Sequence, residues 1–246
     1  MKSCLHAFAM CQSMFCAIPL PGNIWDEKAR DKMLLFLPLV GLEIGLIWAG
    51  LAWLAGVLQL PPLVSGLILC AHPYLITGFL HLDGYMDVTD AVKSWRDLER
   101  RREILKDSHV GSFAVIGVAL LLLAQFALLS SVPDTAPYGI LCLIPVVSRC
   151  GSALAVTVLP PMATSQYAGK TKSTWQIALL CAQALISVAA GFLLCGRYGL
   201  VLLGGLAGYG LALLRAYRSL QGMNGDIAGY ALTVSELCAV AVYALL

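Results

Sequence analysis

Long apolar runs separated by short polar stretches dominate the pattern of residues along the chain. Most of these runs approach the roughly 20 residues that a helix needs to cross the hydrocarbon core of a bilayer. Backbone groups have no water to bond with in lipid, so such runs predict helices rather than isolated strands. We therefore predict an all-α, polytopic transmembrane helical bundle of about seven spans. The predicted spans lie near residues 34–58, 63–80, 110–132, 138–160, 175–195, 199–214 and 229–246.

The first apolar segment, from Leu5 to Leu20, differs from the others because polar residues and prolines interrupt it. Gln12 and Ser13 stand in its middle, and Pro19 stands near its end. This pattern is typical of a helix that lies in the membrane interface or re-enters the membrane, and we predict that placement. The sequence shows no internal repeat, low-complexity stretch or linker, so residues 1–246 are expected to form a single integral membrane domain.

Composition supports lipid as the solvent for most of the chain. Of the 246 residues, 59% are hydrophobic and 12% are charged, against roughly a quarter charged in an ordinary soluble domain. The net charge of +2 is too small for a nucleic-acid partner, which needs clustered lysine and arginine. The nine cysteines are scattered through apolar stretches without a CxxC pair. We interpret them as buried thiols rather than as a zinc site or a disulfide frame.

The lysines and arginines outside the apolar runs lie in alternate loops. They occupy the polar stretches at 26–33, 81–109, 161–174 and 215–228, whereas those at 59–62, 131–137 and 196–198 hold only Arg197. Cytoplasmic loops of membrane proteins carry an excess of positive charge. We therefore expect the four basic loops to face the cytoplasm.

The loop at about 81–109 carries most of the candidate chemistry. Asp83, Asp87 and Asp90 are spaced i, i+4 and i+7, so a second span that continued as a helix would place all three carboxylates on one face. Like charges in a row repel, and carboxylate oxygens are the ligands that Mg²⁺ prefers. Gly84 would let a ligand or another backbone approach them closely. The row predicts a magnesium site; its alternative is a set of aspartates that only solvate a helix end.

A basic stretch follows the aspartates in the same loop. Arg100, Arg101, Arg102 and Lys106 lie on a predicted surface helix that ends near Asp107. By itself such a helix is typical of a segment attracted to anionic lipid head groups. Beside a metal site, the same cations suit a phosphate substrate bridged to Mg²⁺. Carboxylates, metal and cations together indicate phosphoryl transfer.

Further polar residues stand in or near the apolar runs. Arg149 lies in the middle of a predicted span, where a charge costs about 2.5 kcal/mol or more and marks a functional or paired position. As a paired position it would form a structural ion pair, for which Glu43 of the first span is a candidate partner. Asn224 and Asp226 lie in a glycine-flanked loop, where Asp226 can join the metal cluster or both residues can cap the last helix. For Glu236 in the last span, the choice between a functional and a structural role is open as well.

Two motifs of the acidic and basic loop resemble those of the adenosylcobinamide-GDP ribazoletransferases, the cobalamin synthases. HLDGYMDVTDA at 81–91 resembles the family's H-x-D-G-x-x-D-x-x-D element. ERRREILKDSHVG at 99–111 resembles its R-x-x-I-M-K-D-S-x-x-G element. Weaker matches lie at Pro19 to Pro21, 36–45, 148–162 and 222–237, so the likeness covers nearly the whole chain.

Three features depart from the family's pattern. Leu105 stands where methionine is usual, Glu43 stands where an apolar residue is common, and the stretch from Tyr167 to Lys172 is short and lacks a Gly-Leu-Gly. None of these departures removes a carboxylate. The reaction that the resemblance implies is therefore unaffected. The stretch from Tyr167 to Lys172, a substrate loop in the family, is expected to differ.

The resemblance implies a Mg²⁺-dependent phosphotransfer at the cytoplasmic face of a bacterial or archaeal inner membrane. A hydroxyl of α-ribazole, or of its 5′-phosphate, would attack the cobinamide-linked phosphorus of adenosylcobinamide-GDP, giving adenosylcobalamin or its 5′-phosphate and releasing GMP. The candidate residues are Asp83, Asp87, Asp107 and Asp226 for the metal, Asp90, Lys106 and Arg149 for catalysis, and His81, Arg101, Arg102, Ser108 and Asn224 for substrate binding.

The expected partners are the two substrates and the lipid bilayer, with no nucleic acid. A homo-oligomer, or an association with other late enzymes of cobalamin assembly, is left open. One rival class is the CDP-alcohol phosphatidyltransferases, but their Asp-Gly-x-x-Ala-Arg signature is missing, since Tyr85, Met86 and Asp87 follow Gly84. Another is an ion-coupled transporter with intramembrane charges along its pathway. Against it, the acids lie at one membrane face, and no matching pair of broken helices is evident.

Overall fold

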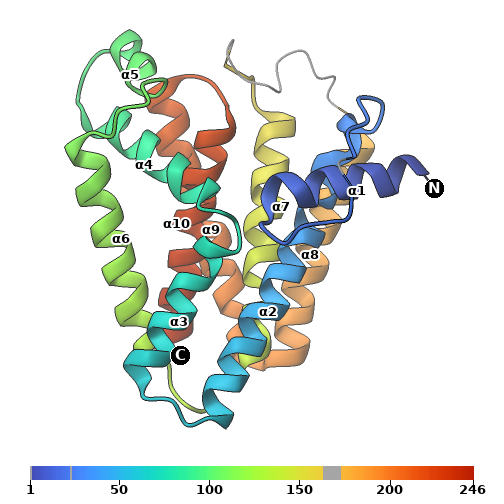
Figure 1. Cartoon of the computed structure of the whole chain (residues 1–246), viewed down its shortest axis with the longest axis vertical. Helices are drawn as coiled ribbons and strands as arrows, with labels where there is room; N and C mark the ends of the chain where they lie inside the picture. The colour runs from blue at the N-terminus through green and yellow to red at the C-terminus, as the bar shows by residue number, and fades with distance from the viewer. Residues whose placement is uncertain (1, 23, 163–172) are drawn as a thin grey trace.

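The computed structural model describes residues 2–22, 24–162 and 173–246, and within them it consists of helices and turns with one isolated bridge. Most helices run roughly along the long axis of the molecule (Figure 1). The expected all-α bundle is therefore confirmed. The α-helices are α1 (Lys2–Phe15), α2 (Leu37–Val57), α3 (Pro62–Leu75), α4 (Leu80–Lys93), α5 (Leu98–Ile104), α6 (Ser112–Ser130), α7 (Ile144–Val158), α8 (Thr174–Cys195), α9 (Leu200–Leu220) and α10 (Gly225–Leu245), and the 3-10 turns are η1 (Arg30–Phe36), η2 (Tyr138–Cys142) and η3 (Gly196–Gly199).

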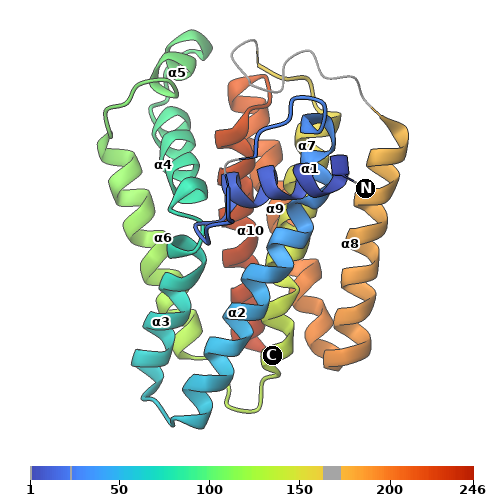
Figure 2. The same cartoon turned by 45° about the vertical axis from the view of Figure 1, so that its right-hand side comes forward.

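Five segments among the described residues are long and apolar enough to cross a membrane, or six if the bent pair of α3 and α4 counts as one span. They are Arg30–Val57, Ser112–Ser130, Tyr138–Val158, Thr174–Leu220 and Gly225–Leu245. The segment Thr174–Leu220 contains both α8 and α9, because the chain turns back at Gly196, which has a φ of +58° (Figure 2). The protein is a multi-pass helical bundle, and seven crossings remain a prediction.

The local sequence explains where several helices begin. Proline stands in the first turn of α2, α3 and α7, where the missing N–H has no helical partner to lose. Asp97 precedes α5 and accepts a hydrogen bond from the backbone N–H of Arg100 at 2.9 Å. α5 is a short polar helix outside the bundle, while the spans that contain α7 and α10 have the largest buried shares.

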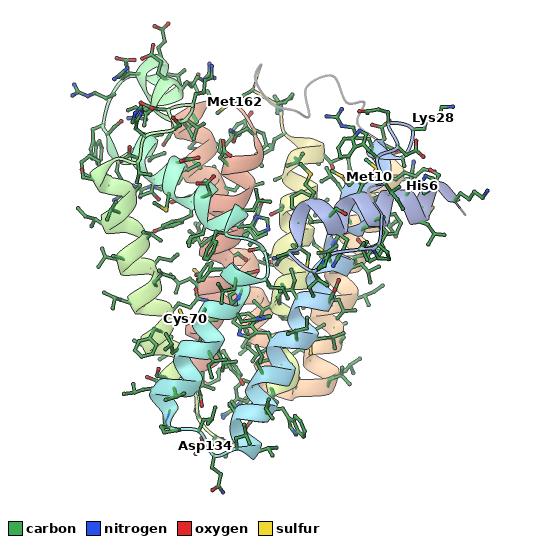
Figure 3. The ribbon with its side chains drawn as sticks, in the orientation of Figure 1. His6, Met10, Lys28, Cys70, Asp134 and Met162 are labelled. Carbon is green, nitrogen blue, oxygen red and sulfur yellow. The ribbon has the colours of Figure 1, made fainter. Side chains whose placement is uncertain are left out.

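The two ends of the bundle differ in charge. The loop that carries Lys28, the short basic helix α5 and the loop before α10 lie at one end, and the turn that carries Asp134 lies at the other (Figure 3). Arg100, Arg101 and Arg102 belong to α5. The separation agrees with the charge pattern of the sequence, apart from Lys170 and Lys172, which lie outside the described residues. Which end faces the cytoplasm remains a prediction.

Helix α1 lies across the bundle instead of along it (Figures 1 and 2). Its 14 residues span about 21 Å, too little to cross a hydrocarbon core of about 30 Å. A hydrogen bond of 2.8 Å from His6 to Asp26 holds one part of it, and this bond lowers the pKa of Asp26. The backbone N–H of Ala17 donates to the carbonyl of Ile76 at 2.7 Å. This crosswise placement fits the expected interfacial or re-entrant helix.

A sharp bend separates α3 from α4. The two helix axes differ by 85°, and the consecutive residues Gly78 and Phe79 have φ values of +58° and +64°, which no α-helix accommodates. The second span therefore does not continue unbroken into the aspartate row, which was the condition under which the sequence placed the three carboxylates on one face. The row nevertheless keeps its helical spacing, because α4 begins at Leu80 and contains Asp83, Asp87 and Asp90.

Glycines allow several helices to pack with their backbones close together. An added Cβ at Gly41 would lie 2.8 Å from Cδ of Arg149, and one at Gly45 would lie 2.7 Å from the carbonyl carbon of Cys142. Gly204 and Gly208 of α9 likewise face Val242 and Cys238 of α10. Small residues at these positions allow the van der Waals contact that drives helix association in lipid.

A buried ion pair joins α7 to α10. Nη1 of Arg149 lies 2.8 Å from Oε1 of Glu236, and their side chains are 1% and 6% exposed. The hydroxyl of Ser148 donates to the same carboxylate oxygen at 2.9 Å. Glu43, which the sequence suggested as the partner of Arg149, is not the residue that pairs with it. The sequence could not choose between the two acids because both lie within apolar helices.

We expect Gly45→Ala to lower the free energy of unfolding by about 1–3 kcal/mol, because the added methyl group meets the backbone of Cys142, which cannot rotate away. Gly50→Ala on the same helix is the matched control, since an added Cβ there has no atom within 4 Å. The control should change stability by less than about 1 kcal/mol. Denaturant titration of the purified proteins in detergent measures both values, and equal losses would contradict the close packing of α2 against η2.

We expect Glu236→Leu to destabilise the protein by about 3–5 kcal/mol, because the buried guanidinium of Arg149 loses its counter-charge. The double variant Arg149→Met with Glu236→Leu removes both charges and should recover most of that loss. The same titration in detergent measures the three proteins. A single variant as stable as the parent would show that the pair is not an obligatory contact between α7 and α10.

Candidate active site

The aspartate row predicted from the sequence lies along α4. Asp83, Asp87 and Asp90 occupy successive turns of this helix; Asp83 is exposed, and the other two are half-buried. Asp87 is within electrostatic reach of Asp83, Asp90 and Asp226. The fold therefore concentrates four carboxylates in one region, one of which comes from a distant part of the chain.

Close packing of α4 against α10 brings Asp226 to this row. An added Cβ at Gly84 would lie 2.9 Å from the carbonyl oxygen of Asp226, so a larger residue there would push the two helices apart. At Gly229 of α10, an added Cβ would lie 3.3 Å from the backbone of His81. The sequence indicated that a ligand or another backbone could approach Gly84 closely. In the structure, that backbone is the first turn of α10.

Asn224 fixes the start of α10 and the position of Asp226. Its side-chain oxygen accepts a hydrogen bond from the N–H of Ile227 at 3.0 Å, which makes it the N-cap of the helix. Its side-chain amide donates to Oδ2 of Asp226 at 2.6 Å. Capping, one of the two roles considered for this loop, is thus performed by Asn224. Asp226 keeps its other carboxylate oxygen for a further partner.

Asp90 makes a contact of another kind. Its Oδ1 accepts a weak hydrogen bond from the N–H of Ala114 at 3.4 Å, in the first turn of α6. A side chain at Gly111 would collide with this carboxylate. Asp90 therefore joins α4 to the amino end of α6, where the helix dipole favours a negative charge. This contact leaves its predicted catalytic role as a prediction.

The polar residues of α5 and of the loop after it differ in what they contact. Arg101 donates to the carbonyl of Ser219 at 3.4 Å, and Arg102 donates to those of Leu220 and Gln221 at 2.9 and 2.7 Å. These carbonyls end α9, so both arginines hold α5 against that helix and offset its dipole. Lys106 is exposed in the loop after α5, as is Ser108. Both are placed to contact a soluble ligand without giving up an internal bond.

Two predicted site residues lie apart from the carboxylates. Asp107 accepts two hydrogen bonds from His109, from the backbone N–H at 3.0 Å and from the ring at 2.7 Å, and these bonds lower its pKa. Its other electrostatic partner is Arg100, not the aspartate row. Arg149 is fully buried in its pair with Glu236. The structure therefore does not bring Asp107 or Arg149 to the row on α4.

A cavity lies between α1, η1, the start of α2, α4, α7 and α10, and Asp226 stands in its wall. His81 also lines it, and the Nε2 atom of this residue is buried without a hydrogen-bond partner. The full lining is Met14, Phe15, Leu34, Leu37, Leu80, His81, Ser152, Val156, Gly225, Asp226, Ala228 and Gly229. Asp226 thus connects the group of carboxylates to a partly enclosed, largely apolar cavity.

Sequence reasoning missed the wall that α1 supplies to this cavity. Met14 and Phe15 come from the last turn of α1, and the ring of Phe15 stacks on that of His81 with centroids 6.1 Å apart. No motif marks these residues, since Phe and Met within an apolar segment are usual core residues. Only the interruption of that segment by Gln12 and Ser13 suggested a special placement.

The donor atoms near Asp226 suit a magnesium ion in kind. Asp83, Asp87 and Asp226 offer carboxylate oxygens only, which is the ligand type that Mg²⁺ prefers. As the side chains lie, no group of three or more His, Cys, Asp or Glu among the described residues is arranged to enclose a metal ion. The backbone brings the right donors together, and the metal remains a prediction.

Comparison with known proteins gives one consistent result. A family model described as cobalamin-5-phosphate synthase matches residues 7–244. A protein of Clostridium perfringens (strain SM101) is 37% identical over 246 residues, with 98% of each chain covered, and one of Clostridium botulinum (strain Alaska E43) is 33% identical over 244 residues, with 96% covered. One of Desulfitobacterium hafniense (strain Y51) is 33% identical over 240 residues, with 89% of this chain and 88% of the relative covered.

All three relatives are named adenosylcobinamide-GDP ribazoletransferase. No solved structure matches the chain. The family match includes both central motifs and the cavity residues of α1, α4, α7 and α10. Because that match and the relatives extend over almost the full length, the chain belongs to the cobalamin-5-phosphate synthase family.

Proposed function

We propose that the protein joins adenosylcobinamide-GDP to α-ribazole, or to its 5′-phosphate, and releases GMP. The names of its relatives and its family membership support this transferase reaction over a phosphatidyltransferase or a transporter. The observation that carries the proposal is the grouping of Asp83 and Asp87 with Asp226, which lines a partly enclosed cavity. A site for two large substrates needs both charge for a diphosphate and a space that excludes water.

The reaction is an exchange of partners at phosphorus. A ribose hydroxyl of the acceptor would form a new P–O bond to the cobinamide-linked phosphorus. The bond from that phosphorus to the bridging oxygen of the diphosphate would break. GMP would leave with the bridging oxygen, and the hydroxyl proton would pass to a carboxylate. Asp90 is the candidate for that proton, since it ends the row on α4 and stays half-buried.

We propose Mg²⁺ as the cofactor, held by Asp83, Asp87 and Asp226. When bound, it would neutralise charge on the phosphate oxygens and act as a Lewis acid. Rotation of these side chains about their own bonds would turn their oxygens toward a shared ion, because Gly84 already holds the two backbones together. Asn224 would hold Asp226 in place through the hydrogen bond that its side-chain amide donates. Asp107 is not needed for this set.

Cationic groups would steady the diphosphate and the departing GMP. Lys106 is exposed near the end of the bundle that carries α5, so its ammonium can reach an anionic substrate. Arg101 and Arg102 would contribute through their field, since their hydrogen bonds are used on α9. The basic loops support a site that faces the cytoplasm across an inner membrane, where soluble substrates are available.

We expect Asp87→Asn to lower the rate of GMP release by at least about 100-fold, because the group most surrounded by other carboxylates loses its charge. Asp134→Asn, at the opposite end of the bundle, is the matched control and should keep the parental rate (Figure 3). The assay supplies adenosylcobinamide-GDP, α-ribazole and Mg²⁺ to protein in detergent and follows GMP and cobalamin. Full activity in Asp87→Asn would remove the carboxylate row from the mechanism.

We expect a chelator to abolish GMP release and added Mg²⁺ to restore it. A readout without turnover is the electron spin resonance of Mn²⁺, whose signal from free ions should fall in the presence of the parent protein. Asp226→Asn should weaken this binding about 10-fold or more, while Asp134→Asn should not. Equal Mn²⁺ binding by all three proteins would place the metal elsewhere. Ion uptake into liposomes without any GMP release would instead support a transporter.

A further inference from the structure

The cavity beside Asp226 is lined mostly by apolar residues, so it suits only some chemical groups of the two substrates. Met14, Phe15, Leu34, Leu37, Leu80 and Val156 form its apolar walls. The polar side chains that line it are His81, Ser152 and Asp226. The hydroxyl of Ser152 is already used, since it donates to the carbonyl of Ala228 at 3.4 Å. A ligand deep in this cavity would therefore meet few hydrogen-bonding groups.

His81 supplies the one polar group of these three that is buried and unpaired. Its Nε2 is inaccessible to solvent and has no hydrogen-bond partner, although burying such a group unpaired costs about 1–3 kcal/mol. Gly229 lets the backbone of His81 pack against α10, and Phe15 stacks on its imidazole at an interplanar angle of 14°. His81 thus lines the cavity, and rotation of its side chain would turn the unpaired nitrogen toward a bound ligand.

We propose that this cavity binds the aromatic base of the acceptor nucleoside, with Nε2–H of His81 donating a hydrogen bond to the base's free ring nitrogen. The inference rests on the proposed function. The base of ribazole is a flat dimethylbenzimidazole, which has an apolar face and edge and a single unsubstituted nitrogen acceptor. One buried donor among apolar walls matches that pattern. Phe15, whose ring is nearly parallel to that of His81, gives the flat ring an aromatic surface to lie against.

The other candidate groups fit these walls less well. Guanine presents several donors and acceptors along its edge, and most of them would stay unpaired here, at a cost for each. A corrin ring carries amide side chains around its rim, which need many polar partners. The position of Asp226 in the same cavity adds the direction: a nucleoside whose base lies beside Phe15 and His81 would extend its ribose toward the carboxylates.

Equilibrium binding of α-ribazole to the detergent-purified protein tests the proposal without turnover. Phe15→Leu should weaken this binding about 10-fold and should leave binding of adenosylcobinamide-GDP within about twofold. Phe8→Leu is the matched control: Phe8 also lies on α1 in an aromatic pair, with Phe36, but it does not line the cavity. Weaker binding of the corrinoid substrate in Phe15→Leu, or no effect on either ligand, would overturn the assignment.

The hydrogen bond itself is tested with an acceptor whose ring nitrogen is replaced by carbon, the riboside of 5,6-dimethylindole. The parent protein should bind α-ribazole about 5- to 10-fold more tightly than this analogue. His81→Phe should lose that preference, and His81→Gln, which keeps an N–H donor, should retain part of it. An unchanged preference in His81→Phe, with its folding verified by thermal unfolding, would overturn the role of His81.

Failure of the inference and failure of the proposed function give different results. If the parent protein releases GMP from the two substrates but Phe15→Leu and His81→Phe bind α-ribazole normally, the reaction stands and the base lies elsewhere. If the parent protein releases no GMP and also does not bind α-ribazole, both proposals are wrong. If it binds α-ribazole with the expected preference but releases no GMP, the cavity assignment stands and the reaction assignment is wrong.

Discussion

The contact between α4 and α10 is the constraint on which the candidate site depends. Asp226 lies far along the chain from Asp83 and Asp87, and it reaches them only because Gly84 lets the first turn of α10 pack against α4. The contact also sets the depth of the cavity, since Gly229 holds the backbone of His81 one turn further along α10. A single helix pair thus positions both the charged and the apolar parts of the site.

A second contact joins α7 to α10 in the interior of the bundle. Arg149 of α7 is bound to Glu236 of α10, and Gly41 of α2 leaves room for the arginine side chain. α7 also provides Ser152 to the cavity wall. The buried pair therefore fixes the distance between the two walls, and we interpret Arg149 as a structural residue whose charge is within reach of His81.

Much of the architecture follows from the sequence, because lipid restricts a spanning segment to few structures. The apolar runs predicted the helices, and the interrupted run from Leu5 to Leu20 predicted a segment that does not span. The spacing of Asp83, Asp87 and Asp90 predicted their common face, which survived even though the helix restarts after Gly78 and Phe79. Local spacing is kept in any helix, whichever direction that helix takes.

The parts that the sequence left undecided depend on which helices are neighbours. Asp107 belongs to a motif with Lys106 and Ser108, yet in the fold it pairs with His109 and not with the row on α4. Glu43 and Glu236 were equivalent as partners of Arg149 until helix packing distinguished them. Phe15 carries no motif at all, and only the crosswise course of α1 makes it part of the cavity.

The bend between α3 and α4 has a consequence for how a ligand loses its water. Because of this bend, α4 starts in the middle of the bundle and rises toward the end where α5 lies (Figure 1). His81 and Asp90 are nine positions apart on it, about 14 Å along the helix axis. One helix therefore carries both the cavity wall at Leu80 and His81 and the carboxylates that follow it. A ligand with an apolar end and an ionic end can bind along this helix while only its apolar end is removed from water.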